Sequence, residues 1–80
     1  MRLDKYLKVS RIIKRRTVAN EACDAARVLV NGKAARASYE VKLDDVIEIN
    51  LGAKPVKLVV TALQESAGKE SASQNFRVVE

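Results

Sequence analysis

Histidine is absent from this 80-residue chain, and cysteine occurs once, as Cys23. A chain without histidine has no His-based catalytic triad, and one cysteine without histidine leaves no plausible zinc site. A single thiol cannot form an internal disulfide, which fits a reducing cytosol. Because Cys23 lies among alanines, we interpret it as a small buried hydrophobe, with a reactive thiol as the alternative.

Aromatic residues and long apolar runs are also scarce. The chain has two tyrosines, one phenylalanine and no tryptophan, so serial stacking of bases on aromatic rings is not expected to dominate any nucleic-acid binding. No apolar run approaches the length of a membrane span, and the basic start lacks the apolar core of a signal peptide. We expect one small cytoplasmic domain with no cofactor and no metal site.

Positive charge is concentrated at the start of the chain. The first sixteen residues carry one acid, Asp4, and seven basic side chains: Arg2, Lys5, Lys8, Arg11, Lys14, Arg15 and Arg16. This segment therefore has a charge of +6, whereas the whole chain has +5, so the remaining 64 residues sum to −1. A dense array of Lys and Arg suits a phosphate backbone. The alternative is a solvated helix face.

The N-terminal half reads as two helices. Leu3, Tyr6 and Leu7 are spaced as one helix face, and the basic residues that recur every three positions from Arg2 form a cationic ridge. Thr17 is the expected N-cap of a second helix, which should end near residues 26–27. Its small residues would let the two helices approach closely: Val18, Ala19, Ala22, Cys23 and Ala26.

The rest of the chain has β character. Residues 28–30 are β-prone, Asn31-Gly32 is a strong hairpin signal, and residues 33–37 form the expected return strand. Residues 46–51 and 56–60 read as two further strands joined by a turn. Residues 65–75 are polar and small, so we expect a flexible loop there, followed by a possible last strand to Val79.

Several segments together resemble the S4 RNA-binding domain. They are Arg2-Leu3-Asp4-x-x-Leu7, Arg15-Arg16-x-x-Ala19, Val28-x-Val30-Asn31-Gly32-Lys33, and an acidic turn before Val46-Ile47-x-Ile49. The resemblance covers residues 1–50 and leaves 51–80 as a C-terminal extension. The chain has Arg15-Arg16 where the family often has Ser-Arg. It has Ala26, and Asp44 before Asp45, where the family often has glycine, so these two positions bear on turn geometry.

The resemblance implies an α+β fold, the S4 (alpha-L) fold, with two N-terminal helices packed on a small, mainly antiparallel sheet. It implies that the helix pair and the adjoining loop bind structured RNA. We expect the RNA-binding residues to be Asp4, the seven basic residues given above, Lys33, Arg36 and Lys42. Asp4 could pair with a nearby Arg, accept a hydrogen bond from a ribose 2′-hydroxyl, or simply be a helix-terminal charge.

The opening is similar to a narrower group of free-standing S4 proteins, which includes small heat-shock S4 proteins and ribosome quality-control factors. That similarity implies a monomer that binds 23S rRNA of the large ribosomal subunit and peptidyl-tRNA. A NEMF-type protein on the same particle would add C-terminal alanine tails to the stalled chain. The alternatives are a ribosome-assembly or heat-shock factor, a generic structured-RNA module, an enzyme, and a protein- or membrane-binding module.

Overall fold

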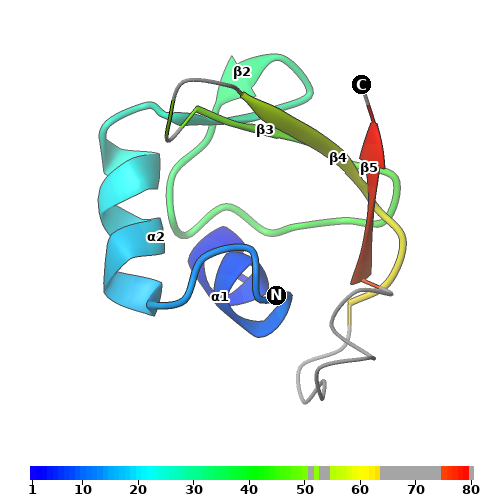
Figure 1. Ribbon diagram of the computed structural model, residues 1–80, viewed down its shortest axis with the longest axis horizontal. Helices are drawn as coiled ribbons and strands as arrows, with labels where there is room; N and C mark the ends of the chain where they lie inside the picture. Colours follow the sequence, from blue (N-terminus) through cyan, green and yellow to red (C-terminus); the bar gives the residue numbers. More distant parts are fainter. Residues whose placement is uncertain (51, 53–54, 64–74, 80) are drawn as a thin grey trace.

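The computed structural model describes residues 1–50, 52, 55–63 and 75–79. Two helices lie on one face of a five-stranded antiparallel sheet, which confirms the predicted fold class (Figure 1). Neither helix in these residues is long and apolar enough to cross a membrane.

Helix α1 spans Leu3–Val9 and helix α2 spans Arg16–Asp24. Leu3, Tyr6 and Leu7 are fully buried, as their spacing predicts. Helices of seven and nine residues are too short to be stable alone in water, so their stability depends on this packing.

The ends of both helices differ from the prediction. Arg2 precedes α1, and Arg11 follows it with a left-handed φ of 59°, so the expected cationic ridge lies on helix only at Lys5 and Lys8. Helix α2 starts at Arg16 without a side-chain cap, so Thr17 is not the N-cap. A tertiary ion pair of Arg16, described below, holds the chain at this point instead.

Helix α2 also ends earlier than expected. Its last residue is Asp24 rather than residue 26 or 27, because Ala26 has a φ of 59° and cannot continue a right-handed helix. Asp44, the other position where the S4 resemblance suggested glycine, has a φ of 71°.

The strands are β1 (Val28–Val30), β2 (Lys33–Ala34), β3 (Val46–Ile49), β4 (Val56–Val60) and β5 (Phe76–Val79). They are arranged in the order β2-β1-β3-β4-β5, and every neighbouring pair is antiparallel. Strands β2 and β5 therefore form the two edges of the sheet.

The β1–β2 hairpin turns at Asn31 and Gly32, whose φ angles of 53° and 84° match the predicted turn. Strand β2 is shorter than predicted, because the chain leaves the sheet to pack against α1. Ala37 is buried, and its carbonyl accepts a hydrogen bond from the Asp4 N–H at 3.1 Å. The chain from Ala35 to Val41 thus lies beside the start of α1.

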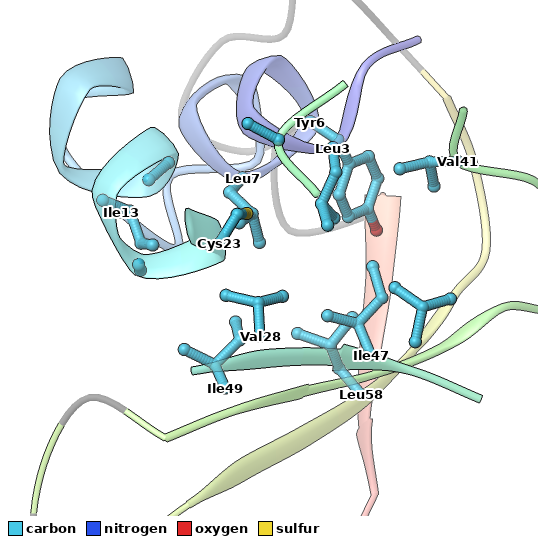
Figure 2. Close-up of a cluster of buried hydrophobic side chains, with 14 of the residues drawn as sticks. Leu3, Tyr6, Leu7, Ile13, Cys23, Val28, Val41, Ile47, Ile49 and Leu58 are labelled. Carbon is cyan, nitrogen blue, oxygen red and sulfur yellow. The ribbon is translucent and has the colours of Figure 1, made fainter. Parts of the chain in front are cut away.

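The core lies between the helices and the sheet, and it includes residues from β4 as well as from the first fifty residues (Figure 2). Leu58 and Val60 of β4 are fully buried. The Tyr6 hydroxyl donates to the Asn75 carbonyl at 2.5 Å, and the buried Asn75 amide donates to Ser10 Oγ at 3.1 Å. Apart from Asn75, the loop predicted over 65–75 lies outside the described residues.

Cys23 is buried in the same core, which supports its interpretation as a small hydrophobe. Burial, together with the charges of Asp4 and Asp24, raises the pKa of its thiol to about 11. The thiolate is therefore scarce at neutral pH, and the thiol is a poor nucleophile.

Candidate nucleic-acid interface

Asp4 connects the two helices through its buried carboxylate. It is 2% exposed and lies in the first turn of α1. Its oxygens accept hydrogen bonds from Arg2 Nε and Arg16 Nε, each at 3.2 Å. They also accept from Asn20 Nδ2 at 3.4 Å and from the Lys5 N–H at 2.8 Å. We call Asp4, Arg2, Arg16 and Asn20 the Asp4 clamp.

The Asp4 clamp carries a net positive charge. Burial raises the pKa of Asp4, but hydrogen bonds from Arg16, Asn20 and the Lys5 N–H outweigh this effect and leave the pKa below its usual value. The carboxylate is therefore ionised at neutral pH and balances one of the two guanidinium charges. The side chains of Arg2 and Arg16 stay 50% and 46% exposed. Each keeps donors free for a phosphate oxygen.

The predicted pairing of Asp4 with a nearby arginine is therefore confirmed, and it involves two arginines. The carboxylate is covered by its partners, so its first effect is to fix where the two guanidinium groups lie. A fixed guanidinium loses less side-chain entropy on binding phosphate than a free one.

The other basic residues of the N-terminal segment surround the Asp4 clamp in sequence. Lys5 and Lys8 lie on α1, and Lys5 is half-buried. Arg11, Lys14 and Arg15 are exposed in the connection between the helices. This connection is anchored by Ile13, which is buried and whose N–H donates to the Leu7 carbonyl at 3.1 Å.

Lys33, Arg36 and Lys42 lie on the hairpin side of the molecule and are exposed. Lys33 is in β2, Arg36 follows it, and Lys42 precedes β3. Lys33 and Arg36 line a hollow whose lining residues do not include those of the clamp. The Lys42 N–H donates to a second buried carboxylate, Asp45, at 2.9 Å.

Sequence analysis did not predict two residues whose hydrogen bonds help to position this surface, Asn20 and Tyr39. Asn20 lies one helical turn after Arg16, so its place on the same helix face could have been inferred from the spacing. Tyr39 lies in irregular chain, where no periodicity applies. Its carbonyl accepts a hydrogen bond from the Leu3 N–H at 2.8 Å, which ties its segment to the start of α1.

Nothing in the described part of the chain is arranged as a metal centre, since no three Asp, Glu or Cys side chains there could hold an ion. Both buried carboxylates are occupied by hydrogen bonds that stabilise the structure. The arrangement can bind anions through exposed guanidinium and ammonium groups.

Comparison with known proteins identifies the family and close relatives. The S4 domain matches residues 1–47. A Streptococcus pneumoniae protein described as "RQC P-site tRNA stabilizing factor" is 48% identical over 79 residues, which cover 99% of this chain and 90% of the relative. A Bacillus subtilis protein with the same description is 44% identical over 79 residues, which cover 99% and 92%.

A solved structure resembles this one over almost its whole length. It is described as the trimeric structure of Vibrio cholerae Heat Shock Protein 15. The two structures superpose with a TM-score of 0.92 at 26% sequence identity, and the match covers 99% of this chain and 81% of the other.

Proposed function

This chain belongs to the S4 domain family, and from that premise we propose that it is an RNA-binding factor of ribosome-associated quality control. In this role it binds the large ribosomal subunit and steadies the peptidyl-tRNA in the P site. The observation that carries the proposal is the near-full-length similarity to relatives described as RQC P-site tRNA stabilizing factors.

The Asp4 clamp and the surrounding cations are the proposed RNA-contacting surface. Arg2, Arg16 and the exposed cations of the interhelical connection bind phosphates of 23S rRNA and of the tRNA. Recognition through phosphate and ribose reads shape rather than sequence, which suits a folded RNA target. Lys33, Arg36 and Lys42 extend this surface.

The proposal also covers the partner protein, the cellular location and the oligomeric state. A NEMF-type protein on the same particle adds the alanine tail, and this chain contributes binding rather than catalysis. We propose a cytoplasmic monomer, although Heat Shock Protein 15 is described as trimeric. Light scattering across a concentration series distinguishes the two states, and a constant mass near three times 8.8 kDa would overturn the monomer.

Sedimentation with large subunits tests the proposed surface. Arg16→Ala should lose most subunit association while the protein still folds, with a melting temperature lowered by several degrees, because Asp4 loses one guanidinium partner but keeps Arg2. Arg77→Ala, at an exposed cation of edge strand β5, is the matched control and should bind as the wild type does. Unchanged sedimentation of Arg16→Ala would refute the surface.

Two further measurements separate the alternatives. If about five phosphates are neutralised, log affinity should fall against log salt with a slope of about −4, and a slope near zero would refute phosphate binding. A quality-control factor should prefer large subunits that carry peptidyl-tRNA over empty ones. Equal binding to both would favour the assembly or heat-shock alternative.

A further inference from the structure

A hollow beside the β1–β2 hairpin has no part in the Asp4 clamp. It is an open depression of about 660 Å³, within the range of small-molecule sites, and is lined by the hairpin and the segment that follows β2. Its lining residues include Val30 and Ala35 and one aromatic residue, Tyr39. We call it the hairpin hollow.

A buried carboxylate holds the walls of the hairpin hollow in place. Asp45 is 7% exposed and accepts hydrogen bonds from Asn31 Nδ2 at 3.0 Å, from the Tyr39 hydroxyl at 2.8 Å and from the Lys42 N–H at 2.9 Å. The Asn31 side-chain oxygen in turn accepts from the Val46 N–H at 3.0 Å. The Tyr39 ring is thereby fixed at its hydroxyl end before any ligand arrives.

The charge of the hairpin hollow has one sign. Among the described residues that line it, Lys33 and Arg36 are the charged ones, and the buried Asp45 carboxylate lies behind the lining residues Asn31 and Tyr39. Tyr39, which is partly buried against the core, brings an aromatic ring to the lining beside two cations, and this combination complements a ligand that joins a planar ring to a phosphate. Unpaired RNA bases stack on tyrosine in this way, and their phosphates bind Lys and Arg.

We propose that the hairpin hollow binds a single unstacked nucleotide of RNA, with its base against Tyr39 and its phosphate at Lys33 and Arg36. The proposal rests on the proposed function in that the ligand is RNA. It adds a preference for an unpaired nucleotide that the phosphate-binding clamp alone would not give.

The position of the hairpin hollow allows one RNA to reach both sites. The Tyr39 carbonyl accepts from the Leu3 N–H, and the Ala37 carbonyl accepts from the Asp4 N–H. The segment that carries Tyr39 is therefore joined directly to the first turn of α1, next to the Asp4 clamp. A stem whose backbone lies on the clamp could place a bulged nucleotide in the hairpin hollow.

The direct test on the unmodified protein is NMR titration with adenosine 5′-monophosphate, with sodium phosphate as the comparison. The nucleotide should shift the Tyr39 ring resonances together with the Lys33 and Arg36 amides, whereas phosphate should shift only the two amides. Identical shifts from both probes, or none from the nucleotide, would overturn the proposal.

A pair of variants isolates the ring. Tyr39→Phe and Tyr39→Leu both lose the hydrogen bond to Asp45, but only Tyr39→Phe keeps an aromatic surface. The wild type and Tyr39→Phe should bind an RNA hairpin with one bulged adenosine at least about fivefold more tightly than the fully paired hairpin, and Tyr39→Leu should bind both equally. A preference that survives in Tyr39→Leu would overturn the proposal.

Arg16→Ala distinguishes this proposal from the proposed function. It should weaken binding of both hairpins alike and leave their ratio unchanged. Loss of the bulge preference with intact Arg16-dependent subunit binding would overturn only the hairpin hollow. A bulge preference without subunit binding would overturn only the proposed function.

Discussion

Replacing Ala26 with glycine should stabilise the protein. Ala26 is exposed and has a φ of 59°, a conformation that L-residues with a Cβ atom adopt at a cost of about 1–2 kcal/mol. Its N–H donates to the Cys23 carbonyl at 3.0 Å, and this bond does not depend on the side chain. Glycine removes the backbone strain without removing a buried contact.

The conformational entropy of the unfolded chain reduces this gain in stability. Glycine has more unfolded conformations than alanine, which costs about 0.4–1 kcal/mol. The difference between the two effects predicts a net rise of up to about 1.6 kcal/mol in the free energy of unfolding, with a central value of about 0.8 kcal/mol. For a domain of this size, 1 kcal/mol corresponds to about 4–8 °C in melting temperature.

Thermal and urea unfolding, followed by circular dichroism, measure this effect. Ala25→Gly is the matched control, because Ala25 is also exposed but has a φ of −86°. There glycine relieves no strain, so the free energy of unfolding should fall by about 0.4–1 kcal/mol. If Ala26→Gly destabilises the protein as much as Ala25→Gly does, the argument from left-handed geometry is wrong.

Three other outcomes follow from the structure. Ala22→Leu should lower the free energy of unfolding by about 1–3 kcal/mol through overpacking between α2 and the core, with Ala25→Leu, at an exposed position, as the control in urea titrations. Asp4→Asn should lower the free energy of unfolding by about 1–3 kcal/mol, because the buried site loses its charge-assisted hydrogen bonds, and it should weaken RNA binding in filter assays. The control Asp24→Asn, at an exposed position, should change the free energy of unfolding by less than about 0.5 kcal/mol. Stability should be nearly constant between about pH 5 and 8. The free energy of unfolding should fall below about pH 4. The folded pKa values of Asp4 and Asp45 are lowered, so in acid these two carboxylates are protonated in the unfolded chain before they are in the folded protein. The free energy of unfolding should also fall above about pH 9. The pKa values of Cys23 and Tyr6 are raised to about 11 and 12 in the folded protein, so these groups lose their protons first in the unfolded chain. A midpoint of acid unfolding near pH 6 would contradict this account.

Local sequence signals predicted helices and turns correctly where the conformation of a residue depends on the residues next to it in the sequence. The apolar spacing of Leu3, Tyr6 and Leu7 gave the buried face of α1, and Asn31-Gly32 gave the hairpin turn. Both signals act within a few residues, so long-range contacts do not have to be known.

The same reasoning failed where long-range contacts decide the outcome. The basic residues repeat every three positions from Arg2 to Arg11, but α1 ends at Val9 and the repeat does not form one ridge. Thr17 has the chemistry of an N-cap, yet α2 begins at Arg16. Asp44-Asp45 reads as a turn, which is correct for Asp44, but nothing in the local sequence indicated that Asp45 would be buried among three donors.

The two buried carboxylates explain how so small a fold can hold cations in fixed positions. Helices of seven and nine residues, and a strand of two, have little intrinsic rigidity. Asp4 joins side chains from residues 2, 16 and 20, and Asp45 joins groups from residues 31, 39 and 42. Each carboxylate therefore acts as a cross-link between separate segments that carry basic or stacking groups. Because each carboxylate is buried, salt should screen these cross-links less than it screens the fully exposed contacts with RNA. Raised salt should release the RNA while the cationic surface keeps its shape.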